Sequence, residues 1–337
     1  MSKNIPTDSG KKTRKTRIVA SVRQQAEQSL AFASLVLIFL FFALANSAFY
    51  SWSNITGILL STAVTGMLAI GTTFVIITGG IDLSIGTATT LSAVVTAQLL
   101  TNLNLSVTAG ILVGIVFGAL FGAVNGILIT FLKLPPFIAT LATMLVAKGL
   151  ALVISDVRPI YTDSVDGWSE IALGELIPNL PNAVLILAVA AVVASIILNR
   201  TIIGRYTFAI GSNEEATKLS GVNVTKWIIL IYAIGGVFVG LAGIILTSRL
   251  NSAQPALGSG YELEAIAAVI IGGTSLLGGK GSILGTVIGA LIMAVLINGL
   301  RIMEIQQEWQ TVVVGAVIIL AVYTDSLRRR RRANSVS

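Results

Sequence analysis

Long uninterrupted apolar stretches dominate this chain. Between Glu27 and Lys133 only Asp82 is charged. Because a bilayer core takes about 20 helical residues per crossing, a stretch of this length must be threaded through a membrane repeatedly. The apolar runs are continuous and do not alternate with period two, which favours helices over membrane strands. The sequence therefore predicts an all-α, polytopic membrane protein.

Breaking the apolar windows at polar residues and at Pro/Gly clusters divides the chain into spans. About ten transmembrane helices are expected, some of them broken at Gly-Gly pairs. They cover residues 30–49, 55–78, 84–101, 107–131, 136–155, 183–199, 226–248, 262–277, 282–300 and 309–325. In the fourth span, glycines recur every four residues. This spacing is typical of close helix–helix approach, although glycine is also simply tolerated in lipid; the residues are Gly114, Gly118, Gly122 and Gly126.

The composition excludes several kinds of chemistry. The 337 residues are 55% hydrophobic and 11% charged, with no Cys and no His, which rules out an ordinary water-soluble enzyme. Zinc, haem and thiolate sites, as well as Ser-His or Cys-His nucleophiles, need side chains that are absent here. The net charge of +7 comes from the two ends, since 7 of the 22 Lys and Arg lie in residues 1–29 and 5 in Arg328–Arg332. A nucleic-acid partner is therefore not expected.

The distribution of basic residues predicts the orientation. If the N-terminal tail is cytoplasmic, the inside segments hold 18 Lys/Arg and the outside segments three. Cytoplasmic loops retain positive charge, so both termini are expected inside. The predicted organisation is a basic cytoplasmic tail (1–29), a transmembrane domain (30–325) and a second basic cytoplasmic tail (326–337). Within the domain, the loop 156–182 is expected outside the membrane and the loop 200–226 on the cytoplasmic side.

Asp82 is the first candidate for chemistry. It lies in the segment Thr78-Gly79-Gly80-Ile81-Asp82-Leu83-Ser84, where paired glycines interrupt a helix. Asp82 or Ser84 can accept the free amides of the next helix as an N-cap. Alternatively, Asp82 is a pore-facing or gating group, because an ionisable side chain at membrane depth usually faces protein or water.

A second Gly-rich interruption runs from Ile271 to Gly281 and includes Thr274 and Ser275. Two interruptions in different halves of the chain are what transporters use to line a central path. Upstream, Glu264 is the deeper of two carboxylates at the start of the eighth span. Lys148 can pair with Asp82 or Glu264, or snorkel to the surface, and the sequence leaves this open. No Walker motif occurs in the chain, so ATP hydrolysis by it is excluded.

The 200–226 segment is the only long cytoplasmic loop between spans. Ser212 or Asn213 can cap a short helix that begins near Glu214, and Gly221 can end it. A short capped helix on a cytoplasmic face is suited to docking in a partner's groove. An ordinary surface connector is the alternative.

Together these motifs resemble the permease subunit of bacterial ribose-type ABC sugar importers, in the branched-chain amino acid and monosaccharide permease superfamily. The resemblance covers roughly residues 30–325. The matching strings are Thr78-Gly79-Gly80-Ile81-Asp82-Leu83-Ser84-Ile85-Gly86, Pro136-Phe137-Ile138-Ala139-Thr140-Leu141, the loop from Gly204 to Val224, Ser252-Ala253-Gln254-Pro255, the run from Gly260 to Ala268, Gly272-Gly273-Thr274-Ser275-Leu276 and Gly278-Gly279-Lys280-Gly281.

The resemblance implies a homodimeric channel in a bacterial inner membrane, docked on a cytoplasmic ATPase pair and on an external sugar-binding protein. ATP and Mg would be bound by the ATPase, and no cofactor by this chain. The substrate would be a monosaccharide, with ribose the leading candidate and xylose or galactose as alternatives. The implied ATPase-coupling residues are Gly211, Asn213, Glu214, Glu215, Ala216, Lys218 and Gly221. The residues expected along the translocation pathway or gate are Asp82, Ser84, Asn125, Glu264, Thr274 and Ser275.

Two other functions are weighed against this one. An ion-coupled secondary transporter of a small polar solute is suggested by the isolated Asp82 and the broken helices. Such a carrier would work without an ATPase and normally uses more than one intramembrane acid. A membrane-embedded enzyme is opposed by the lack of His, Cys and any acid pair at catalytic spacing.

Overall fold

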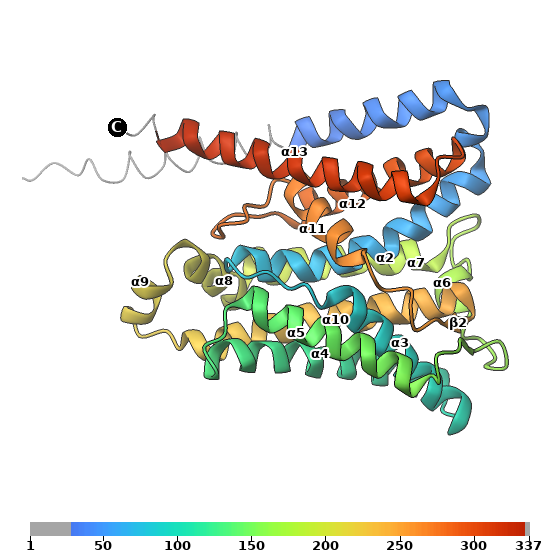
Figure 1. The fold of residues 1–337 in the computed structure, drawn as a ribbon, viewed down its shortest axis with the longest axis horizontal. Helices are drawn as coiled ribbons and strands as arrows, with labels where there is room; N and C mark the ends of the chain where they lie inside the picture. Colours follow the sequence, from blue (N-terminus) through green and yellow to red (C-terminus); the bar gives the residue numbers. More distant parts are fainter. Residues whose placement is uncertain (1–27, 334–337) are drawn as a thin grey trace, which may run out of the picture.

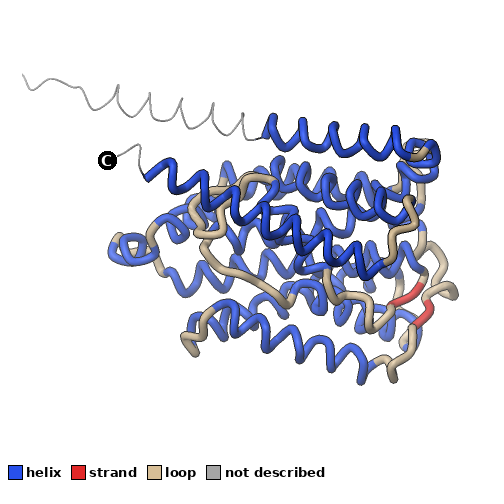
Figure 2. The backbone as a smooth tube through the Cα atoms, turned by 45° about the horizontal axis from the view of Figure 1, so that its top comes forward, coloured by secondary structure: helices blue, strands red, loops and turns tan. Residues whose placement is uncertain are grey.

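The protein is an all-helical bundle, as the sequence predicts. A computed structural model describes residues 28–333, and its helices lie side by side along the long axis of the molecule (Figure 1). Nearly all of the predicted tail 1–29 lies outside the described residues, as do residues 334–337. Figure 2 shows how little of the described chain is strand or loop.

The helices differ greatly in length. The described residues begin with the helix Gln28–Ala45. The elements that follow are the 3-10 helix η1 (Ser47–Tyr50), α2 (Trp52–Ile77), α3 (Ile85–Asn102), α4 (Val107–Phe131), α5 (Pro136–Ile154), β1 (Ile160–Tyr161), α6 (Glu170–Leu173), α7 (Asn182–Arg200), α8 (Ile202–Ser212), α9 (Glu214–Leu219), α10 (Val224–Leu250), β2 (Ser252–Ala253), α11 (Tyr261–Ile271), α12 (Ile283–Ile302) and α13 (Gln307–Ala333). Strands β1 and β2 pair antiparallel, with Ile160 opposite Ala253.

Eight helices of the described chain are long and apolar enough to cross a membrane. Two of the ten predicted spans are not among these eight helices. The predicted span 84–101 is α3, which has 18 residues but too many hydroxyl side chains to be as apolar as the others. The predicted span 262–277 is wrong as a continuous helix: α11 has 11 residues and ends at Ile271. Gly273, with φ +90°, turns the backbone out of the helix there.

Helix α3 lies inside the bundle, which explains its composition. Thr87, Thr89, Thr90, Ser92 and Thr96 are all buried. Hydroxyls of this kind can donate to carbonyls one turn earlier, as Thr89 does to Ile85 at 2.8 Å. Ser92 donates to the Gly114 carbonyl of α4 at 3.2 Å, whereas the Thr96 hydroxyl has no hydrogen-bond partner within the described residues. Protein thus surrounds the hydroxyl groups of this helix.

The four-residue glycine spacing in α4 forms a close helix–helix contact, as predicted. A Cβ atom at Gly118 would overlap the carbonyl oxygen of Gly236 in α10, and one at Gly122 would overlap the carbonyl oxygen of Tyr232. Backbones approach this closely only where neither helix carries a side chain. The outer faces of α4, α5 and α7 carry exposed apolar residues such as Leu112, Leu145 and Val189, which suits contact with lipid.

The two ends of the bundle are different. The β1–β2 pair and α6 lie at one end, and α9 lies at the other (Figure 1). The predicted loops 156–182 and 200–226 are thus on opposite sides, and which side is cytoplasmic stays a prediction. Helix α13 continues through the predicted boundary at residue 326 to Ala333, so the first part of the predicted C-terminal tail is helical.

Candidate functional site

The first interruption separates α2 from α3. Helix α2 ends at Ile77, and Gly79 with φ +85° turns the chain away from the helix axis. Residues 80–84 are non-helical, and α3 begins at Ile85. A backbone without its own helical bonds needs other partners inside a membrane protein, and neighbouring helices provide them here.

Asp82 is buried at the centre of a polar network. Its Oδ1 accepts from the backbone amide of Ser84 at 2.9 Å and from the Ser84 hydroxyl at 2.5 Å. The side-chain amide of Asn125 in α4 donates to Ser84 Oγ at 2.8 Å and to Asp82 Oδ2 at 3.5 Å. Thr143 in α5 donates to Asn125 Oδ1 at 2.7 Å. The network therefore ties the interruption to two further helices.

The capping prediction for this segment is only partly correct. Ser84 is the N-cap residue of α3 but makes no side-chain cap bond. Asp82 binds the amide of Ser84 and none of the helix amides beyond it. The same segment is also held by Thr140 of α5, whose hydroxyl donates to the Ile81 carbonyl at 3.1 Å and accepts from the Leu83 amide at 3.2 Å.

The second interruption follows α11. Gly273, Gly278 and Gly279 all have positive φ. Thr274 is buried, and within residues 28–333 its hydroxyl has no hydrogen-bond partner. The Ser275 amide donates to the Lys280 carbonyl at 3.1 Å, which closes the Gly-rich loop. Thr274 and Ser275 therefore lie in the second interruption, and within the described residues neither shares a hydrogen bond with the Asp82 network.

Glu264 belongs to a third group of side chains. It accepts from the Thr65 hydroxyl at 3.4 Å and lines a cavity of about 80 Å³ together with Arg249, Arg301 and Asn298. The structure thus does not bring Glu264 to Asp82. Of the two alternatives left open for Lys148, the structure supports the surface position over a pairing with Asp82 or Glu264, because Lys148 is exposed on α5.

The predicted coupling residues form a helical arm at the end of the bundle. The Asn213 side chain accepts from the Ala216 amide at 2.8 Å and caps α9, as the sequence predicts. Gly221, with φ +84°, follows the end of α9. Glu214, Glu215, Ala216 and Lys218 are exposed, whereas Thr217 is buried.

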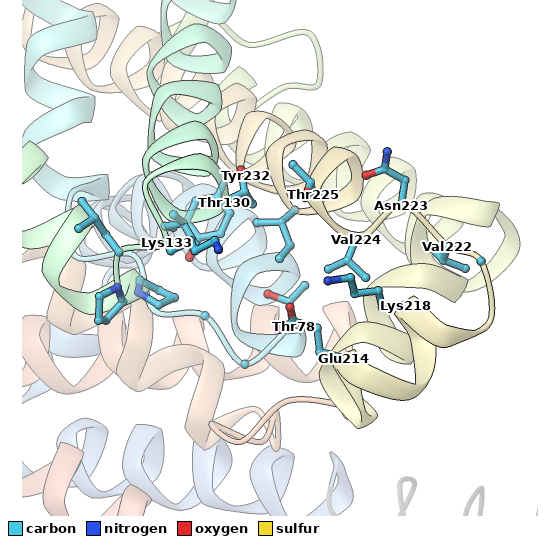
Figure 3. Close-up of a pocket in the computed structure, with 18 residues that line it drawn as sticks. Thr78, Thr130, Lys133, Glu214, Lys218, Val222, Asn223, Val224, Thr225 and Tyr232 are labelled. Atoms are coloured by element: carbon cyan, nitrogen blue, oxygen red, sulfur yellow. The ribbon is translucent and has the colours of Figure 1, made fainter.

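A cavity of about 910 Å³ lies beside this arm. Lys133 of the α4–α5 turn and Lys218 of α9 approach it from opposite sides, and Thr78, Thr225 and Tyr232 also line it (Figure 3). Gly79 and Gly80 of the first interruption are part of its wall. The cavity therefore joins the arm to the interrupted helix.

Two of these residues were missed in the sequence. Lys133 stands out in the sequence as the first charged residue after a long uncharged run, but nothing in the sequence indicates that it faces a cavity. Tyr232 gave none, since it is one aromatic residue in an apolar helix. Its buried hydroxyl has no hydrogen-bond partner within residues 28–333, and a Cβ atom at Gly80 would lie 2.6 Å from it.

This fold and site define a multi-pass helical membrane protein with two interrupted helices and a helical arm at one end, the construction of a transport permease. The model of the family described as "Branched-chain amino acid transport system / permease component" matches residues 54–322. The chain belongs to this family, whose members are transport components and not enzymes.

Curated relatives cover most of the chain. A ribose import permease protein of Bacillus subtilis (strain 168) is 45% identical over 295 residues, which is 87% of this chain and 91% of the relative. One of Haemophilus influenzae is 41% identical, covering 88% and 92%. The D-allose transport system permease protein of Escherichia coli (strain K12) is 38% identical, covering 88% and 90%. No solved structure matches the chain.

Proposed function

We propose that this chain is the membrane-spanning subunit of an ATP-binding cassette importer and forms the path of a monosaccharide, with ribose as the first substrate to test. The observation that carries the proposal is the 45% identity to a ribose import permease along 87% of the chain. Most polar side chains of the interruptions are hydroxyls, and Asp82 and Lys280 are the two charged ones. Such groups suit a neutral, hydroxyl-rich solute.

The helical arm is the proposed docking element for the ATPase. Helix α9 is held by the Asn213 cap while most of its side chains stay exposed, and Leu219 is 83% exposed. A short capped helix with exposed side chains is suited to docking in a groove of a partner. The proposal also includes a second copy of the chain, an external sugar-binding protein, cytoplasmic termini and a bacterial inner membrane.

Reconstitution tests the function. The chain would be placed in proteoliposomes with the ATPase and binding protein encoded beside its gene, and uptake of radiolabelled ribose, xylose and allose measured. We expect uptake of one of these sugars to need ATP and all three proteins. Uptake by the chain alone, driven by an ion gradient, would refute the proposal in favour of a secondary transporter.

The docking role has its own test. Replacing Glu214 and Glu215 together with Lys should lower binding-protein-stimulated ATPase activity and uptake, because the charge of the docking face is reversed. Membrane insertion should be unchanged, since both side chains are exposed. Matched substitutions at Asp163 and Asp166, exposed acids of the 156–182 loop, are the control. Normal coupling in the Glu214/Glu215 variant would exclude this face.

A further inference from the structure

The arm and both interrupted helices meet at one point through their backbones. Gly211 is the penultimate residue of α8. A Cβ atom there would overlap the carbonyl oxygen of Ile77, the last residue of α2, and would lie 2.6 Å from the amide nitrogen of Gly279. The Gly279 amide in turn donates to the Ile77 carbonyl at 2.8 Å. Three segments distant in sequence thus share one backbone contact.

The neighbouring residues tighten this contact. A Cβ atom at Gly278 would lie 2.9 Å from the carbonyl oxygens of Gly211 and Ile77, and equally far from the Gly79 amide. Gly278 and Gly279 have φ of +83° and +72°, a region that disfavours other residues. Two separate requirements, space and backbone conformation, therefore place glycine here. We call Ile77, Gly211, Gly278 and Gly279 the glycine junction.

The arm is also anchored immediately before the junction. Gly204, Thr207 and Ile210 of α8 are buried at intervals of three residues, so one face of α8 packs on the bundle. Beyond Gly211 the arm has exposed side chains only, apart from Thr217 in α9. On its N-terminal side, the exposed α9 is therefore connected to the bundle through Gly211 and α8.

We propose that the glycine junction is the point at which movement of the helical arm is transmitted to both interrupted helices at once. The inference rests on the proposed function, in which an ATPase moves the arm. Side chains can change rotamer and absorb a small movement, whereas backbone groups in direct contact displace each other. The hydrogen bond between Gly279 and Ile77 makes the end of α2 and the second interruption move together.

The transmission requires that the junction stay closed while the arm moves. Gly211→Ala inserts a methyl group between the arm and Ile77 and so separates the segments. We expect the reconstituted complex to keep ATPase binding, because α9 is unchanged, but to lose at least tenfold in binding-protein-stimulated ATPase activity and in uptake. Gly149→Ala is the matched control, since nothing lies within 4 Å of a Cβ atom there.

A covalent cross-link holds the junction closed, whereas Gly211→Ala opens it. This second test does not depend on how well the Ala variant folds. Ser212 and Lys280 are both exposed, and Lys280 adjoins Gly279, where a Cβ atom would lie 3.3 Å from the Cα of Ser212. Ser212→Cys combined with Lys280→Cys therefore keeps every glycine of the junction and places two thiols beside the contact, where oxidation can link them. The native chain has no cysteine, so no other pair can form within it. The oxidised complex should retain at least half of the uptake of its reduced form.

Two results would overturn the inference. One is a folded Gly211→Ala complex with normal stimulation and uptake. The other is loss of uptake on oxidation that is restored by reduction, since the segments would then have to separate during transport. Failure of the proposed function looks different, because the wild-type complex itself would show no ATP-dependent sugar uptake.

Discussion

Two substitutions at Asp82 distinguish a structural role of its carboxylate from a role in proton transfer. In the Asp82→Asn variant an amide oxygen can still accept from the Ser84 amide and hydroxyl. The bond at risk is the one from the Asn125 side chain, which is the longest of the network at 3.5 Å. Asn125 keeps its shorter bond to Ser84. The free energy of unfolding should therefore change by no more than about 1 kcal/mol.

The Asp82→Leu variant removes both acceptor oxygens. The buried Ser84 amide then has no partner, and the Ser84 hydroxyl loses its bond at 2.5 Å. A buried donor left unsatisfied costs about 1–3 kcal/mol, so two of them cost about 2–6 kcal/mol. We expect this variant to give little folded protein.

Thermal unfolding in detergent and sugar uptake in proteoliposomes measure the two effects. Asp82→Asn should retain most of the uptake, and Asp82→Leu should lower protein recovery and melting temperature. Asp163→Asn and Asp163→Leu, in an exposed loop, should change neither. A well-folded but inactive Asp82→Asn variant would refute this reasoning and favour the ion-coupled carrier, because an amide cannot titrate.

Three further predictions concern topology, the arm and the bundle. An impermeant thiol reagent applied to intact cells should label Ser164→Cys but not Ser212→Cys, and the reverse would invert the topology. Asn213→Ala should destabilise α9 by about 1 kcal/mol and lower stimulated ATPase activity, which Asn213→Ser should preserve; equal activities would exclude the cap. Gly118→Val should abolish recovery of folded protein because it separates α4 from α10, and recovery equal to that of Gly149→Ala would contradict the packing.

The helical class and most of the spans could be predicted from the sequence because a membrane span obeys one simple rule. Backbone polar groups must be satisfied within each span, so a long apolar run is a helix. The same rule failed at residues 262–277, where the run is apolar enough but Gly273 takes a conformation that ends the helix. It predicted α3 as the span 84–101, but not that α3 is less apolar than the other spans because protein surrounds its hydroxyl groups.

The local structure of the arm was equally accessible. The Asn213 cap and the end of α9 before Gly221 depend on residues a few positions apart, and local hydrogen bonds decide them. Residues in the interruptions were identified from their unusual types, but not their partners. Asp82 binds Asn125, 43 positions away, and Glu264 contacts Thr65, 199 positions away.

The sequence by itself determined that this chain is a bundle of membrane helices with two glycine interruptions and a capped helical arm, because each of these follows from composition or from neighbours along the chain. Only the tertiary structure decided that Gly211, Ile77 and Gly279 meet, and that Glu264 and Asp82 do not. The physical reason is that a glycine shows where a side chain is missing, whereas the backbone that fills the space is fixed by the packing of helices far apart in sequence.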